Sequence, residues 1–276
     1  MAAIRSRCSR SRDCTAACSS PPGRMMMSSP GIRVAVRWKT SMIFSRLRPW
    51  RNPPTSLDSP RLPGLQPSPD NRHRRRLRDQ LRRAGSLDPE ISALVARIGY
   101  PEPRIHEPGF GTLMQIIISQ QVSTRSAAAV RRRLEQSCRG TVTWRKILNR
   151  GEAGLRACGL SRQKIGYALG LADMIRRGDL DLSALHRMDT REVVGELIRV
   201  RGFGRWSCQI YAMFALGHRD VFPEDDLGLQ LALQRHLGLP DRPTGRESAA
   251  IAERWSPHRS AVALLMWKYH GSATLG

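Results

Sequence analysis

A glycine turn and a pair of acidic residues have the types and spacing that suit chemistry. The turn reads RGFGRWS over residues 201–207, and Asp225 and Asp226 follow it after one helical stretch. Glycine tolerates positive φ and has no Cβ to block a phosphate, while the first amides of a following helix point outward. A nearby carboxylate can stabilise a cationic transition state and activate water. The pattern indicates a phosphate grip beside an electrostatic catalyst.

Two other interpretations of the turn are a nucleotide loop and a plain corner between helices. A dinucleotide fingerprint needs a strand and a third glycine, but Ser207 stands in that position and the preceding EVVGELIRV has helical spacing. The nucleotide loop is therefore disfavoured, and GFG at 109–111 merely opens another helix. A plain helix–helix corner stays open on these residues alone.

Asp226 also has two interpretations. The apolar stretch LGLQLALQRHL begins directly after it, so its carboxylate suits a helix N-cap. Two carboxylates on a basic surface weaken binding to a polyanion. Their presence there is therefore best explained if at least one of them has a functional role. From the residues alone, both the cap and the catalyst stay open.

The elements that must position these residues are helices. Apolar side chains recur on one helical face from Leu77 to Leu134. Further helices are expected at about 161–177, 189–199, 204–216, 227–237, 246–254 and 259–270. Strand alternation is nowhere sustained, and Gly and Pro mark the joints. We predict an all-α domain.

The chain divides near residue 71. Residues 1–71 are rich in Arg, Ser and Pro and cannot bury enough apolar surface to offset their ordering entropy, which predicts a disordered tail before a folded domain at 72–276. The tail resembles an organellar transit peptide, and Met25 to Met27 and Met42 are alternative starts. No function is assigned to it.

The charge balance favours a polyanionic partner. The chain has 46 Lys and Arg against 23 Asp and Glu, a formal net charge of +23, and nearly all of the basic residues are arginines, whose guanidinium groups match phosphate. Part of this charge lies in the tail, but the rest of the chain is basic too.

Cysteine spacing and hydropathy exclude several classes. The cysteines stand singly, without C-x-x-C or zinc-finger spacing, which indicates reduced thiols and no side-chain metal site. No apolar run approaches the roughly 18 residues of a membrane span, and the N-terminus has no secretory apolar block. We expect an intracellular protein in the bacterial nucleoid, or in an organelle or nucleus if the tail is a targeting segment.

Four blocks of sequence carry a family resemblance. The segment LIRVRGFGRWSCQIYAMFALGHRDVFPEDDLGLQ resembles the hairpin and catalytic region of DNA-3-methyladenine glycosylase II, in the helix-hairpin-helix DNA glycosylase superfamily. FGTLMQIIISQQVST, CGLSRQKIGYALGLADMI and ERWSPHRSAVALLMWKY agree in order, so the resemblance covers about residues 72–276. It implies two helical subdomains with a DNA-facing cleft between them and the hairpin at about 193–214.

The resemblance also implies residue roles. Gly202 and Gly204 become the hairpin glycines, and Asp226 the catalytic aspartate. Trp206 and Trp267 fall on tryptophans that line the base pocket, where stacking and cation–π attraction suit a cationic alkylated purine; ordinary core packing is the alternative. The hairpin carbonyls commonly hold a monovalent cation.

The sequence departs from the family pattern at the hairpin and at the insertion position. Arg201 replaces the usual opening proline, and Arg201 and Arg205 are expected to contact DNA. Gln121 occupies the position whose side chain fills the gap left by the flipped base, with a solvent-facing helix end as the alternative. The β domain that precedes the helical core of some members has no counterpart here.

Two absences narrow the expected enzyme. Bifunctional members carry a lysine where Trp206 stands, and no lysine lies between 165 and 267. Cluster-containing members have four cysteines after the catalytic aspartate, and none follows Cys208. We expect a monomeric, monofunctional glycosylase without an iron–sulfur cluster or other cofactor, acting on double-stranded DNA with alkylated purines such as 3-methyladenine. Alternatives are a glycosylase for oxidised or deaminated bases and a non-catalytic DNA-binding module.

Overall fold

The computed structural model describes the backbone of residues 69–273 and the side chains of residues 71–272. The predicted disordered tail lies outside this range except for its last three residues. The first helix begins at Pro69, so the predicted boundary at residue 72 falls inside a helix. Every regular element in the described range is helical, which confirms the predicted fold class. None of the described helices is long and apolar enough to cross a membrane.

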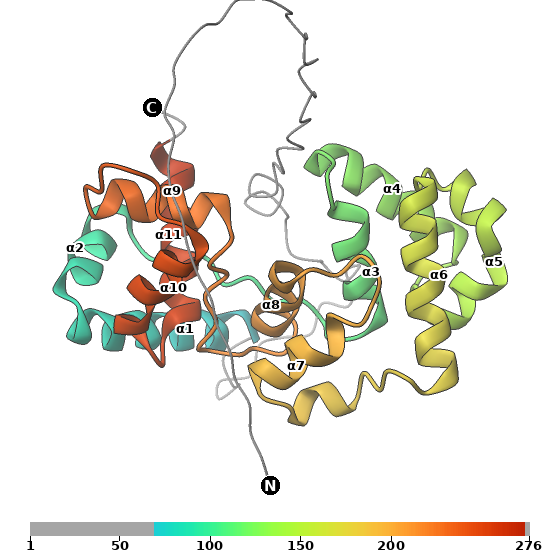
Figure 1. Cartoon of the computed structure of the whole chain (residues 1–276), viewed down its shortest axis with the longest axis horizontal. Helices are drawn as coiled ribbons and strands as arrows, with labels where there is room; N and C mark the ends of the chain where they lie inside the picture. Colours follow the sequence, from blue (N-terminus) through green and yellow to red (C-terminus); the bar gives the residue numbers. More distant parts are fainter. Residues whose placement is uncertain (1–68, 274–276) are drawn as a thin grey trace, which may run out of the picture. The chain divides into compact units, whose positions relative to one another are not determined.

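One group of helices joins the start of the described chain to its end. The group contains α1 (Pro69–Leu87), α2 (Pro89–Ile98), α9 (Leu227–His236), α10 (Gly245–Ala252), the short 3-10 helix η2 (Glu253–Trp255) and α11 (Arg259–Ala273). Helix α11 packs against α1, α2 and α9, so segments far apart in sequence share one core (Figure 1). Trp255 lies fully buried within it.

The second group is built from the intervening residues. It contains α3 (Phe110–Ser119), α4 (Thr124–Ser137), α5 (Trp144–Ala157), α6 (Arg162–Arg177), η1 (Ala184–Arg187), α7 (Thr190–Leu197) and α8 (Arg205–Phe214). Helix α3 packs against α4, α6 and α8, and α5 lies along α6. The two groups correspond to the predicted helical subdomains, with α8 lying next to α7 (Figure 1).

Helix α5 is absent from the predicted helices. Its residues include Gly151, whose φ of 60° and ψ of −170° interrupt the helix with a kink. The apolar spacing is broken there, although Ile147 and Leu155 on either side are buried. A capping signal was present, because the Thr143 side chain accepts a hydrogen bond from the Lys146 amide. The helices that the sequence did predict agree with the observed ones to within a few residues at their ends.

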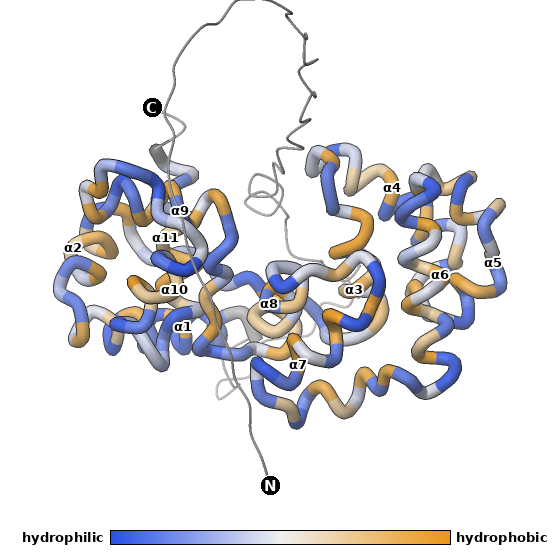
Figure 2. Tube along the Cα trace, in the orientation of Figure 1, coloured by the Kyte–Doolittle hydropathy of each residue, from blue (hydrophilic) through white to orange (hydrophobic). Residues whose placement is uncertain are grey.

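Packing follows from the amphipathic pattern. Figure 2 shows hydrophobic and hydrophilic residues interleaved along the helices, as expected when each helix buries one face. As in α3, where Leu113 to Ser119 are all buried, helix α8 departs from this pattern, because Ser207 to Phe214 are all buried. Its Tyr211 hydroxyl accepts a hydrogen bond from the Gly109 amide at 2.8 Å, which fixes the start of α3 against it. Helix α8 is thus a rigid central support for the residues at its two ends.

Candidate functional site

The glycine turn joins α7 to α8. Its Phe203 amide donates to the Val200 carbonyl at 3.0 Å, and the Phe203 ring is buried. Gly202 has φ +93°, and a Cβ placed there would lie 2.3 Å from the Tyr167 ring. Both the backbone angle and the close approach of Tyr167 require glycine at this position. The turn is therefore locked from the inside by two aromatic rings.

The outer side of the turn is open. Gly204 is the N-cap of α8, no side chain caps the helix there, and a Cβ on Gly204 would meet nothing within 4 Å. The first amides of α8 therefore lack a side-chain acceptor at a surface where an anion can approach. This arrangement fits the predicted grip on a phosphate.

Asp226 is held by donors from three segments. As the N-cap of α9, its Oδ1 accepts from the Leu229 amide at 2.9 Å. Trp267 Nε1 donates to the same oxygen at 2.9 Å, and Trp206 Nε1 donates to Oδ2 at 2.9 Å. The helix-cap interpretation is confirmed, but it does not compete with a catalytic one, because the two indole donors come from outside α9.

The electrostatics of Asp226 are set by opposing effects. The side chain is only 2% exposed, and this burial raises the pKa of the carboxyl, while hydrogen bonds from Trp267, the Leu229 amide and Trp206 act to lower it. Both oxygens accept hydrogen bonds from N–H donors, an arrangement suited to the ionised form, which has no proton of its own to place. The site therefore holds a desolvated carboxylate.

A positive charge lies behind this carboxylate. The Arg104 guanidinium stacks on the Trp267 ring, with its Cζ atom 5.5 Å from the ring centroid. Burial lowers the pKa of Arg104 to about 10, and the charge of Asp226 opposes that change. Arg104 and Asp226 thus stabilise each other's charged form, with the indole of Trp267 between them.

A cleft of about 790 Å³ opens beside the turn. It is lined from α3, α4, α6 and the turn, and its lining includes Gln121, Tyr167, Trp206 and Asp225. Trp206 is half-buried, so one part of this ring faces the cleft while its N–H holds Asp226. Asp226 and Trp267 do not line the cleft, which places them behind Trp206. The structure thus brings Asp226, Trp206 and Trp267 together, and it places only Trp206 at the cleft surface.

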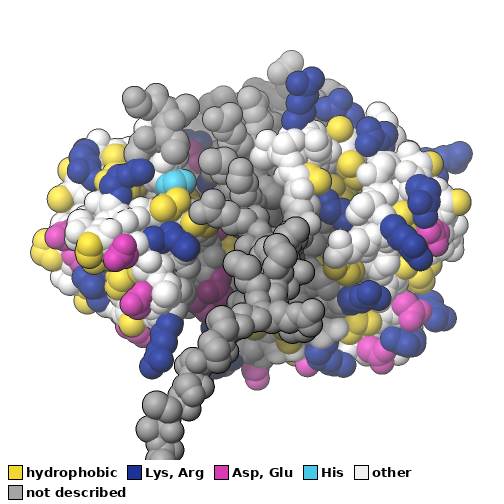
Figure 3. Space-filling view, turned by 45° about the horizontal axis from the view of Figure 1, so that its top comes forward, with side chains coloured by type: hydrophobic (Ala, Val, Ile, Leu, Met, Phe, Trp, Pro, Cys, Tyr) yellow, Lys and Arg dark blue, Asp and Glu magenta, His cyan; other side chains and the backbone are white. Residues whose placement is uncertain are grey.

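The remaining predicted contact residues lie on the rim. Arg201 is exposed, and Arg205 is exposed but forms an ion pair with Glu224, with Nε 2.5 Å from Oε1. Gln121 is exposed just after α3 and has φ +55°, an unusual conformation for a residue with a side chain. Lys and Arg side chains are scattered over both halves of the face in Figure 3.

The turn carbonyls have the donor chemistry that a monovalent cation needs. The Gly202 carbonyl accepts from Gln120 Nε2 at 2.7 Å and the Val200 carbonyl accepts from the Phe203 amide, so each keeps a second lone pair. No cluster of three or more His, Cys, Asp or Glu side chains suited to a metal ion occurs among the described residues.

Three residues of the site were missed by the sequence predictions. They are Tyr167 against Gly202, Arg104 against Trp267, and Glu224, which binds both Arg205 and Gln209. Tyr167 and Glu224 lie in segments that carry the family resemblance, which is the only signal for them. Arg104 lies in a loop and has none.

Comparison with known proteins identifies relatives of this chain. A putative DNA-3-methyladenine glycosylase of Bacillus subtilis is 37% identical over 114 residues, which make up 41% of this chain and 40% of that protein. DNA-3-methyladenine glycosylase 1 of Schizosaccharomyces pombe is 29% identical over 189 residues, 66% of this chain and 82% of that protein. A solved structure of an S. pombe 3-methyladenine DNA glycosylase in complex with abasic DNA is 25% identical, with a TM-score of 0.60 over 69% of this chain and 95% of that one. Residues 114–258 match the model of one family, and the chain belongs to it: the HhH-GPD superfamily of base excision DNA repair proteins.

Proposed function

We propose that this protein is a monofunctional DNA glycosylase that removes alkylated purines, such as 3-methyladenine, from double-stranded DNA and leaves an abasic site. The observation that carries the proposal is the buried Asp226 carboxylate, held by the indole N–H groups of Trp206 and Trp267 beside an open hairpin turn. The names of the two glycosylases aligned above support the substrate class.

Binding to the duplex begins at the hairpin. The amides around Gly204 and the start of α8 contact one backbone phosphate without reading the sequence. A monovalent cation held by the carbonyls of residues 200 and 202 would add a positive charge at this contact. Arg201 extends the contact, and the Arg205–Glu224 ion pair places a second guanidinium beside it.

The chemical step uses Asp226 as the catalytic residue. A damaged base flipped from the duplex enters beside Trp206, and unstacking costs least for a weakly paired lesion. Breaking the N-glycosidic bond gives the sugar oxocarbenium character, which the carboxylate stabilises while it orients or deprotonates the attacking water. A purine alkylated at a ring nitrogen such as N3 carries a positive charge while it is attached to the sugar, and it leaves as a neutral base with the electron pair of the broken bond, so a strong general acid is not required.

Trp206 must move during this step. Its N–H occupies Asp226 Oδ2, and the carboxylate is almost fully buried. The sugar reaches that oxygen only when the indole turns aside, which also places its ring face against the base for stacking and cation–π attraction. Gln121 lines the same cleft, which supports the proposal that its side chain fills the gap in the duplex.

The proposed lack of lyase activity depends on the absence of a free amine at the reacting sugar. Strand cleavage through a Schiff base requires an amine at the reacting sugar, and no lysine lies between residues 165 and 267. Lys164 lines the same cleft, but its Nζ donates a hydrogen bond to the Ile118 carbonyl at 2.6 Å, which holds the amine against α3. The proposal requires no iron–sulfur cluster or other cofactor.

Duplexes with a single lesion test the proposal. Each carries 3-methyladenine, hypoxanthine, 8-oxoguanine or uracil, and abasic sites are scored after alkali for the natural chain, Asp226→Asn and Asp225→Asn. We expect release of 3-methyladenine, a loss of about a hundredfold or more for Asp226→Asn, and a small effect for the exposed Asp225. No release from any duplex refutes the enzyme and leaves a DNA-binding module, and strand breaks without alkali refute the monofunctional class. Release confined to the oxidised or deaminated base assigns a different substrate.

A further inference from the structure

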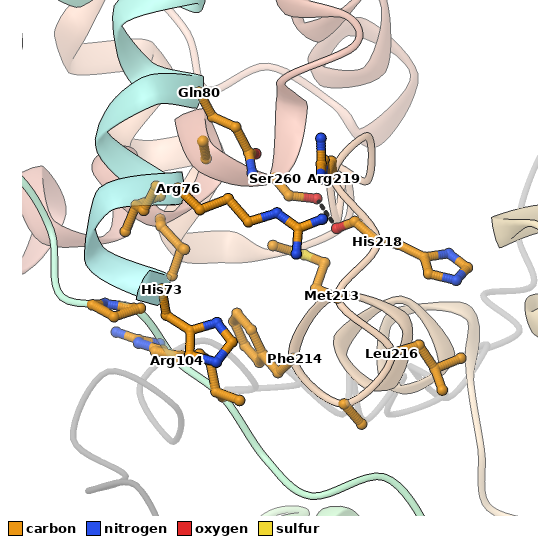
Figure 4. Close-up of a pocket in the computed structure, with 17 residues that line it drawn as sticks. His73, Arg76, Gln80, Arg104, Met213, Phe214, Leu216, His218, Arg219 and Ser260 are labelled. Atoms are coloured by element: carbon orange, nitrogen blue, oxygen red, sulfur yellow. Dashed lines mark hydrogen bonds between the residues drawn. The ribbon is translucent and has the colours of Figure 1, made fainter. Parts of the chain in front are cut away.

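A second cavity lies at the opposite end of α8 from the hairpin. Its volume is about 260 Å³, and it is lined by residues of α1, the loops around 104 and 218, the end of α8 and the start of α11 (Figure 4). Helix α8 has 10 residues. A helix of this length spans about 15 Å, so the cavity lies well away from the amides that the hairpin presents.

The described lining of this cavity is basic. It includes His73, Arg76, Arg104, His218 and Arg219, and no Asp or Glu occurs among the described residues that line it. Asp220, next in sequence to Arg219, is already bound to Arg259, with Oδ1 2.8 Å from the guanidinium Nε. The positive charges of the cavity therefore lack a carboxylate at their own site.

Two of these guanidinium groups act on each other. The pKa of Arg76 is lowered by burial and by the charge of Arg219, which means that the two groups come close enough to repel. In the described part of the chain, neither forms an ion pair or a side-chain hydrogen bond. Both side chains are exposed, so solvent screens part of this repulsion, and an anion bound between them would relieve the rest.

Arg104 supplies an independent observation on the same cavity. Its Nη1 atom is buried and has no hydrogen-bond partner among the described residues. Buried guanidinium N–H groups are normally satisfied, and the described contact of this group is with the face of the Trp267 ring, which accepts no such hydrogen bond in the ring plane. The unmet donor is satisfied if the guanidinium turns toward an acceptor oxygen in the cavity that its residue lines.

We propose that this cavity binds a small phosphate-bearing anion. The guanidinium groups of Arg76, Arg104 and Arg219 offer more donors and charge than one carboxylate can match, whereas a phosphate group has three or four acceptor oxygens and up to two charges. Leu77, Met213 and Phe214 form an apolar wall beside the charged groups, as Figure 4 shows for the two labelled side chains. The phosphate group belongs either to a free anion or to the backbone of bound DNA.

Calorimetry on the full chain with inorganic phosphate and pyrophosphate as probes tests the site. The test variant is Arg76→Gln/Arg219→Gln. The matched control is Arg150→Gln/Arg187→Gln, which removes the same charge from two exposed arginines that do not line the cavity. We expect one-to-one pyrophosphate binding that weakens by about tenfold or more in the test variant and less than about twofold in the control. Circular dichroism checks that both variants are folded.

Affinity for undamaged duplex DNA, measured on the same variants, identifies the source of the phosphate. A loss confined to the test variant assigns the site to the DNA backbone, and equal affinity in both variants assigns it to a free anion. The proposal is overturned if the natural chain does not bind pyrophosphate, or if the two variants lose pyrophosphate affinity equally, because the binding then depends only on net charge.

Discussion

The indole N–H of Trp267 is expected to control the pH at which Asp226 becomes active. Trp267→Phe keeps an aromatic ring near Phe214, whose centroid lies 5.9 Å away, and removes the donor to Asp226 Oδ1. This donor favours the ionised carboxylate, so its loss raises the pKa of Asp226 further above the ordinary value. Base release, which needs the carboxylate, is then lost at a higher pH when the solution is acidified.

The magnitude follows from the type of hydrogen bond. A bond to a charged group contributes about 1.5 to 3 kcal/mol, and about 1.4 kcal/mol corresponds to one pH unit, so the acid limb of kcat/KM is expected to move up by about one to two units. The assay is single-lesion base release between about pH 4 and pH 8, with kcat/KM fitted at each pH.

Trp255→Phe is the matched control. Its Nε1 also donates to an N-cap aspartate, Asp88, at 2.8 Å, in a fully buried position away from the site. Both substitutions leave a small cavity, and each is expected to lower the free energy of unfolding by about 1 to 3 kcal/mol. Only Trp267→Phe should move the acid limb. An unchanged limb in Trp267→Phe, or an equal movement in Trp255→Phe, would refute the proposed link between the indole and the carboxylate.

Three further substitutions test the geometry. Arg104→Gln removes the positive charge that interacts with Asp226, so the acid limb should rise by up to about one pH unit, equivalent to about 1.4 kcal/mol; an unmoved limb contradicts the electrostatic role. Gly202→Ala is expected to cost about 2 kcal/mol or more in urea unfolding, because it combines positive φ with a clash against Tyr167; wild-type stability would show that the turn relaxes freely. Gln121→Gly should change the free energy of unfolding by less than about 1 kcal/mol, because the relief of positive φ offsets the added entropy of the unfolded chain. Base release should fall in this variant. Unchanged release would favour the interpretation that Gln121 only faces solvent.

The sequence predicted the helices well where apolar residues recur without interruption. Helix α5 was missed because Gly151 breaks that spacing, even though its residues on both sides of the kink are buried. At Asp226, the N-cap and the catalyst are alternatives in the sequence, because the sequence pattern around one helix predicts the cap of that helix but cannot show donors that come from other segments. The structure shows that one carboxylate both caps α9 and collects two indole donors from other segments.

The parts of the site that escaped prediction depend on contacts between distant segments. Arg104 and Trp267 are separated by more than half of the chain, and nothing in the local spacing of either indicates that a guanidinium stacks on that ring. Trp267, which is expected at the base pocket, is 5% exposed and contacts Asp226 rather than the described cleft surface, so its contact with a base stays a prediction. The local sequence pattern indicates which residues are candidates for the site. Tertiary packing between distant segments determines how each of those side chains is oriented.

The first group of helices is assembled from the two ends of the described chain, and this has a consequence for synthesis on the ribosome. Helices α1 and α2 are made before the other described helices but bury their apolar faces against α11, which follows all of those helices in the sequence. The second group, which contains the hairpin, is continuous in sequence, so its helices can pack against one another soon after they are synthesised. The nascent chain therefore forms its glycine turn before Trp267 arrives to hold Asp226, so the proposed capacity to bind DNA at the turn should precede the proposed capacity to cleave a base.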